Sequence, residues 1–158
     1  MSTNNINEAK ESVEVSLKVN GQNIRIDQSK IMDKFFTERD LSTISNSPFF
    51  KINSVEWGYG FIEQVDGKDS VIDIPTDSTG LETVLAENTP SLSYPNNIIT
   101  IRCVLPANTV PENDVYYFSA LNIKDAKGNC IIVCAVLPIP VTSDRLLQFD
   151  IEIRKVEA

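Results

Sequence analysis

The stretch that decides the fold reads Val115-Tyr-Tyr-Phe-Ser-Ala-Leu-Asn-Ile123, then Lys124-Asp-Ala-Lys-Gly-Asn129, then Cys130-Ile-Ile-Val-Cys-Ala-Val-Leu137. Two apolar runs of strand length flank a short polar segment that contains a glycine. This pattern is typical of a β-hairpin with a tight turn. The hairpin predicts a largely antiparallel β fold, and it carries no chemical motif of its own.

A second hairpin is predicted near the N-terminus, over residues 13–27. Apolar residues alternate with polar ones from Val13 to Val19 and again at Ile24 and Ile26, and Asn20-Gly21 stands between the two runs. An Asn-Gly pair in this position is a strong hairpin signal because both turn residues need positive φ. After it the period changes, and the spacing of Ile31, Met32, Phe35 and Phe36 predicts an amphipathic helix over 28–41.

Further strands are predicted over 50–57, 71–74, 98–105 and 147–153, with loops at 42–48, 88–95 and 106–114. The segment 81–87 reads either as one or two helical turns or as a surface loop, and Pro138-Ile-Pro140 reads as a corner outside any central ladder. We expect a mainly β fold, an antiparallel sandwich or a small barrel of about seven or eight strands with one helix. Residues 1–11 are predicted to be a flexible arm and 12–158 a single domain.

Composition excludes several classes of function. The chain has 158 residues and a net charge of −8. An acidic chain is a poor binder of nucleic acid or of anionic membranes, because both require a basic face. The first residues are polar and lack the apolar core of a signal peptide, and no apolar run has the length of a membrane span. We therefore expect a protein made in a cytoplasm, without a nucleic-acid or membrane partner.

The three cysteines, Cys103, Cys130 and Cys134, all lie in apolar strand runs. An odd number in a chain of this length does not indicate a disulfide framework, so buried free thiols are expected. Cys130 and Cys134 are four residues apart, which in a regular strand places both on one face and too far apart to form a disulfide.

No enzymatic motif is recognisable. The chain contains no histidine, which removes Ser-His-Asp and Cys-His arrangements and leaves the cysteines without partners for zinc. The segment from Asp125 to Asn129 is too sparse for a calcium loop, and a structural turn is the better interpretation. We therefore predict no catalytic residue, no cofactor and no metal site.

The candidate interface residues are aromatic: Trp57, Tyr59, Tyr116 and Tyr117. A tryptophan beside Gly58-Tyr59-Gly60 at a strand end would either stack on a partner or a sugar, or fill one end of the core. Tyr116 and Tyr117 are neighbours on a strand, so one is expected in the core and the other on the surface or at an interface.

Residues 50–154 resemble the N-terminal domain of phage tail-collar fibre proteins and related tail-fibre attachment domains. The order of the pieces carries the resemblance: a helix over 31–41, a strand ending in Gly58-Tyr59-Gly60, a Leu-rich segment over 81–86, the strand to Pro106, the hairpin 120–132, the corner 137–140 and a last alternating strand over 146–153.

The resemblance implies a non-enzymatic virion protein of the tail, fibre or baseplate, without catalytic residues. Its implied partners are other tail proteins, in a symmetric homo-oligomer such as a trimer or hexamer. A second hypothesis is a carbohydrate- or cell-surface-binding β-sandwich in which Trp57, Tyr59 and one of Tyr116 and Tyr117 form a stacking platform. A small enzyme that uses paired carboxylates is a third, weaker alternative.

Overall fold

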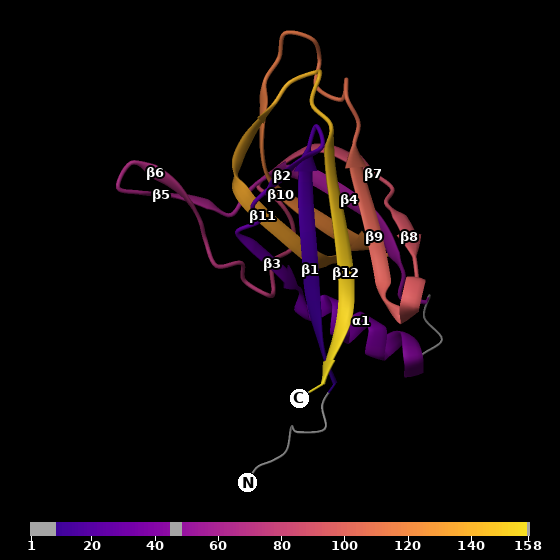
Figure 1. Ribbon diagram of the computed structural model, residues 1–158. Helices are drawn as coiled ribbons and strands as arrows, with labels where there is room; N and C mark the ends of the chain where they lie inside the picture. The colour runs from indigo at the N-terminus through magenta and orange to yellow at the C-terminus, as the bar shows by residue number, and fades with distance from the viewer. Residues whose placement is uncertain (1–8, 45–48, 158) are drawn as a thin grey trace.

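The computed structural model describes residues 9–44 and 49–157, and two five-stranded antiparallel sheets form its body (Figure 1). The first sheet has the order β2-β1-β12-β9-β8, with β1 Ala9–Val19, β2 Gln22–Ile24, β8 Ser91–Ser93, β9 Ile99–Leu105 and β12 Leu147–Glu157. The second has the order β3-β11-β10-β4-β7, with β3 Gln28–Ile31, β4 Ile52–Tyr59, β7 Thr83–Asn88, β10 Tyr116–Asp125 and β11 Cys130–Val141.

Three smaller elements complete the fold. Strands β5 (Ile62–Val65) and β6 (Lys68–Val71) pair only with each other in a two-stranded arm that projects from the body (Figure 1). Helix α1 (Asp33–Ile44) lies at the opposite end, and a short 3-10 turn spans Pro95–Asn97. The expected β-sandwich is thus confirmed. The described residues form no closed barrel, and they hold twelve strands because several short edge strands escaped prediction.

The main core lies between the two sheets. Alternating residues of β1, β9 and β12 face inward and meet those of β4, β10 and β11. This alternation of buried and exposed positions is what period-2 patterning requires in a half-buried strand. Three aromatic rings fill the centre: Trp57, Phe118 and Phe149, whose centroids lie 5.7 to 5.8 Å apart.

The outer face of the second sheet is also covered. Cys130, Val133 and Ala135 on β11 pack there against Met32 and Ile74, and Phe61 and Val71 lie around them. The chain after β6 is held in place by hydrogen bonds. The Asp33 backbone N–H donates to the Thr76 carbonyl over 2.9 Å, and Lys30 Nζ donates to the Ile74 carbonyl over 3.0 Å.

Both predicted hairpins form, and their turns have the expected chemistry. Asn20 and Gly21 have φ of 49° and 84°, so both occupy the left-handed region that a two-residue turn requires. In the second hairpin, Asp125 Oδ1 accepts hydrogen bonds from the backbone N–H groups of Lys127 (2.9 Å) and Asn129 (2.8 Å). The Asp125–Asn129 segment is therefore a structural turn, as the sequence indicated.

The predicted helix is displaced toward the C-terminus. Residues Gln28–Ile31 form strand β3 on the edge of β11, and α1 begins at Asp33 and continues through Ile44 into the predicted loop. Ile31 and Met32 fit a helical spacing, but the backbone of β11 pairs with this segment, and the Met32 N–H donates to the Ile131 carbonyl over 2.8 Å. Tertiary strand pairing here overrides local periodicity. Residues 45–48 of the predicted loop lie outside the described residues.

Five further predictions are wrong in whole or in part. Within 81–87, the residues from Thr83 onward belong to β7, which pairs with β4, and the loop 88–95 contains β8. The corner at Pro138–Pro140 lies within β11, where a register shift lets Pro140 pair with Tyr117. The strand predicted over 71–74 is replaced by β6, which ends at Val71. Residues 9–11 of the predicted arm belong to β1 and pair with β12; its first eight residues lie outside the described residues.

The cysteines are buried free thiols, as expected, but their arrangement differs from the prediction. A register shift places Ile123 opposite Ile132 and Lys124 opposite Cys130, which leaves Ile131 as an extra residue. This bulge reverses the alternation, so that Cys134 faces the main core and Cys130 faces the outer cluster. The prediction that both share one face is wrong because it assumed a regular strand.

A glycine is required at position 58 because β7 passes unusually close to β4 there. An added Cβ would lie 1.9 Å from the Thr83 carbonyl oxygen and 3.0 Å from Leu81 Cδ1. At Gly80, by contrast, a Cβ would meet nothing within 4 Å. Gly58 thus permits the irregular pairing of β4 and β7, whose register shifts between Trp57 and Gly58.

We expect Gly58→Ala to displace β7 and to lower the free energy of unfolding by about 1–3 kcal/mol, the usual cost of overpacking. Urea denaturation followed by circular dichroism measures this change. Gly80→Ala is the matched control and should leave the midpoint nearly unchanged. Equal midpoints for the two variants would contradict the close approach of β7.

Burial raises the pKa of the Cys103 and Cys130 thiols to about 12 and also raises that of Cys134. All three are therefore protonated at pH 8, and a neutral buried thiol is a poor nucleophile. We expect Ellman's reagent to react slowly with the folded protein at pH 8 and rapidly with all three cysteines in urea.

The raised pKa values of the three thiols also determine how the free energy of unfolding changes with pH. Above pH 9, the ordinary pKa of these thiols, they ionise only in the unfolded chain. Their contribution to the free energy of unfolding is therefore present below pH 9 and declines as the pH rises further. Fast labelling of the folded protein by Ellman's reagent would contradict the burial of these side chains.

Candidate functional site

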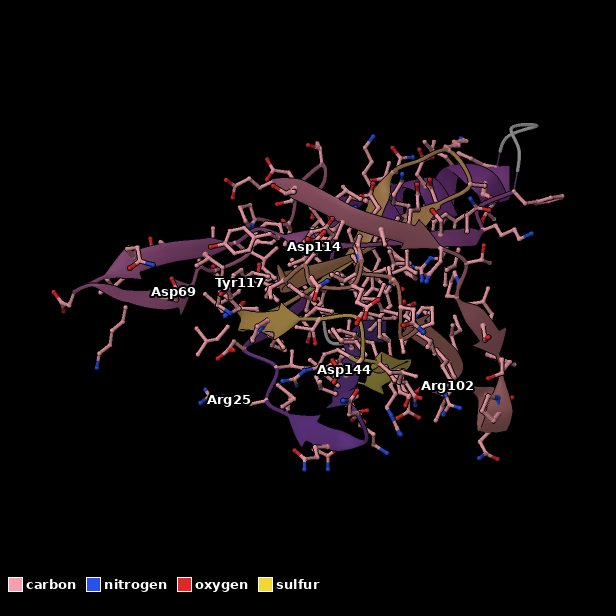
Figure 2. All side chains as sticks on the ribbon, turned by 90° about the horizontal axis from the view of Figure 1, so that it is seen from above. Arg25, Asp69, Arg102, Asp114, Tyr117 and Asp144 are labelled. Carbon is pink, nitrogen blue, oxygen red and sulfur yellow. The ribbon has the colours of Figure 1, made fainter. Side chains whose placement is uncertain are left out.

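Three of the four aromatic residues singled out in the sequence meet in one open groove. Tyr59, Tyr116 and Tyr117 line it on the side of the sandwich body, and Asp69 lines it from the projecting arm (Figure 2). The remaining lining residues are Thr83, Leu85, Val115 and Pro138. The groove has a volume of about 480 Å³ and lies where β4 ends and β7 and β10 begin. We call it the tyrosine groove.

Tyr59 is positioned by the residues on either side of it. Gly58 lets β7 approach, as described above, and Gly60 is fixed by a buried hydroxyl. Ser119 Oγ accepts from the Gly60 N–H and donates to the Gly60 carbonyl, each over 2.8 Å. Ser119 stands at the register shift between Phe118 and Ala120, so its side chain satisfies backbone groups that the regular ladder leaves unpaired.

Tyr116 and Tyr117 occupy the first two positions of β10, opposite Val141 and Pro140. Tyr116 is half-buried and packs against the main core, whereas 57% of Tyr117 is exposed. This division matches the expectation for neighbours on a strand, although both side chains line the groove. Val115, which is 49% exposed and also lines the groove, extends the apolar surface before the pair.

Trp57 does not reach the surface. The side chain is fully buried between Phe118 and Phe149. Its Nε1–H donates to Asn88 Oδ1 over 3.1 Å, which satisfies the one polar atom of the ring. Trp57 therefore fills the core, the second of the two possibilities that the sequence left open, and its use as a stacking surface is excluded in this conformation.

Asp69 is the one charged residue among the described residues that line the groove, and its carboxylate accepts a hydrogen bond from Gln64 within the arm. The chain as a whole carries a net charge of −8. A ligand in the groove would therefore meet a negative charge, and no positive one, on the part of the lining that the structure describes.

Sequence reasoning missed Asp69, Thr83, Leu85, Val115 and Pro138. Asp66 and Gly67, a residue pair typical of tight turns, connect the two strands of the arm, and both have positive φ in the structure. Pairing of the short flanking strands was not predicted, because β5 and β6 carry few apolar residues. Only the arrangement of the arm, β7 and the end of β11 in space brings these residues beside the tyrosines.

A second concave surface, which we call the end cavity, lies at the opposite end of β4. It has a volume of about 500 Å³ and a largely apolar lining that includes Phe35, Phe50, Ile52, Tyr94, Ile99 and Ile153. At its rim, Arg39 pairs with Glu11 and lies over the rings of Phe35 and Phe36 at 5.6 and 5.5 Å. This cavity could not be predicted from the sequence, because its lining residues come from segments that are distant in the chain.

The described residues offer no obvious centre for metal chemistry. Within residues 9–44 and 49–157, no three His, Cys, Asp or Glu side chains are grouped so that they could hold a metal ion. No helix in the same ranges is both long and apolar enough to cross a membrane. The tyrosine groove and the end cavity are both lined mainly by apolar side chains, and both suit apolar contact.

Comparison with known proteins identifies the family. The family model for bacteriophage P1 tail fiber protein R matches residues 14–144, which is most of the chain and includes the hairpin of β10 and β11 and most of the N-terminal hairpin. No curated protein and no solved structure is significantly similar to the chain. The match bears out the resemblance to phage tail-fibre proteins noted from the sequence. The chain belongs to the bacteriophage P1 tail fiber protein R family and is a phage tail-fibre-related protein.

Proposed function

We propose that the protein is a non-enzymatic structural part of a phage virion that joins tail, fibre or baseplate proteins through protein–protein contacts. The observation that carries this proposal is the family match over residues 14–144. The groove geometry supports it, because tyrosines in an apolar concave surface are typical of protein interfaces. Tyr59, Tyr116 and Tyr117 are then interface residues, whereas Trp57 supports them from the core.

The proposal includes a symmetric homo-oligomer, of which a trimer or a hexamer is the expected form. Closed symmetry is the rule for soluble oligomers. The arm formed by β5 and β6 supports an assembly role, since an isolated two-stranded hairpin is marginally stable in water and gains stability from a neighbour. The location that follows is the virion, after synthesis in the cytoplasm of the host.

We expect the protein to be present in purified particles of its phage and to form a defined oligomer in solution. Peptide mass spectrometry of the particles tests the first point. Light scattering over a concentration series tests the second, with masses expected at a multiple of the 17.6 kDa chain. A strict monomer that is also missing from the particles would refute the assembly role.

Carbohydrate binding is the second candidate function, and the tyrosine groove is the observation that favours it. Exposed aromatic rings can stack on a sugar. A carboxylate beside them can accept hydrogen bonds from the hydroxyl groups of the sugar. Tyr117 and Asp69 would contact the sugar in place of Trp57, which is buried. If this candidate is correct, a glycan array will show binding that is lost in Tyr117→Ala; an array without binding eliminates it.

A further inference from the structure

We propose that the tyrosine groove binds an extended segment of a different protein, in which apolar residues or prolines flank a lysine or arginine. The proposal rests on the assembly role given above and names the chemistry of the partner. Two observations support it: the shape and composition of the groove, and the negative charge of Asp69 on its lining.

The lining of the groove suits a narrow, extended segment. Tyr59, Tyr116, Leu85 and Pro138 provide an apolar surface, and Tyr117 is a large exposed side chain within it. Tyrosine loses little conformational entropy when it is immobilised, which makes it an effective contact residue. Aromatic grooves of this kind also recognise proline-rich segments, because such segments are extended before they bind.

The charges favour a cationic partner. Within residues 9–44 and 49–157, Asp69 is the one charged residue on the lining of the groove, and the chain carries a net charge of −8. A lysine or arginine of the partner could pair with Asp69 and lie against the face of Tyr117, which adds a cation–π contact. An acidic or uncharged segment of the same shape would leave this carboxylate partly desolvated without compensation.

The same charge argues against two alternatives. Two copies of this chain that met groove to groove would bring their Asp69 carboxylates together, within molecules that each carry a net charge of −8. A neutral sugar could stack on the tyrosines and donate hydrogen bonds to Asp69, but it would not neutralise the carboxylate. A basic segment of another protein does both, because it contacts the aromatic surface and pairs with Asp69.

A peptide library tests the proposal without knowledge of the natural partner. Random 12-residue peptides are selected on the immobilised full chain, with the Tyr117→Ala variant as the counter-selection. The enriched peptides are then synthesised, and their dissociation constants are measured by fluorescence anisotropy at low and high NaCl. We expect enrichment of lysine or arginine next to proline or aliphatic residues.

The variants divide the affinity between the two features of the groove. Tyr117→Ala should weaken binding about tenfold or more, as truncation of a central aromatic contact does. Asp69→Asn keeps the shape but should weaken binding by about twofold to fivefold and reduce the salt dependence, since it removes one exposed ion pair. Tyr94→Ala is the matched control, because Tyr94 is 64% exposed but lies at the end cavity.

Several results would overturn the inference. They are failure to enrich any peptide, enrichment of peptides without a basic residue, and binding that survives Tyr117→Ala in a variant with an unchanged melting temperature. Binding of glycans but not of peptides would assign the groove to sugars. Presence of the protein in purified particles is measured in a separate experiment. If the protein is in the particles but binds no peptide, the groove assignment alone is refuted. If the protein is absent from the particles, the assembly role is refuted.

Discussion

The contact between Trp57, Phe118 and Phe149 is the interaction on which the rest of the structure depends. Trp57 and Phe118 come from one sheet and Phe149 from the other, and each ring is fully buried. Tilted and edge-on aromatic pairs contribute about 0.5–1.5 kcal/mol each beyond the burial of their area. The cluster also has a polar link, since Asn88 on β7 accepts from the Trp57 indole and donates to the Val104 carbonyl on β9 over 2.8 Å. One side chain thereby joins the two sheets.

Two irregularities in strand pairing lie between the aromatic core and the tyrosine groove. The register of β4 with β7 shifts beside Gly58, and the register of β10 with β11 shifts between Phe118 and Ala120. A bulge bends a strand and redirects its side chains. Here both irregularities stand next to groove residues, and Ser119 satisfies the backbone groups of Gly60 that would otherwise be buried without partners. The groove is thus built on fixed backbone instead of on a free loop.

Local signals predicted those parts of the fold that are themselves local. The turns at Asn20-Gly21 and Asp125–Asn129 need particular backbone angles or a side-chain acceptor, and the sequence provides them at these positions. The start of α1 and the strand β7 were missed because pairing with β11 and β4, distant in the chain, determines them.

The candidate site shows the same division between local and distant information. Tyr59, Tyr116 and Tyr117 could be selected by residue type and by position at strand ends. Trp57 is buried in part by Phe149, which lies more than ninety residues further along the chain. Asp69 reaches the groove because β6 of the projecting arm contacts β11, which lies more than fifty residues further along the chain. The split of Cys130 and Cys134 between two faces likewise depends on one bulge that alternation alone does not reveal.

The two concave surfaces are connected by one central strand. Strand β4 runs from Ile52, which lines the end cavity, to Tyr59, which lines the tyrosine groove. At about 3.3 Å per residue these positions are roughly 23 Å apart along one strand. That strand lies inside a sheet, hydrogen-bonded to β10 on one side and to β7 on the other. Neighbours bound at the two ends would therefore be connected through paired, well-packed backbone. Because β4 is hydrogen-bonded on both edges, displacement at one of these surfaces would be resisted by its ladders with both β7 and β10.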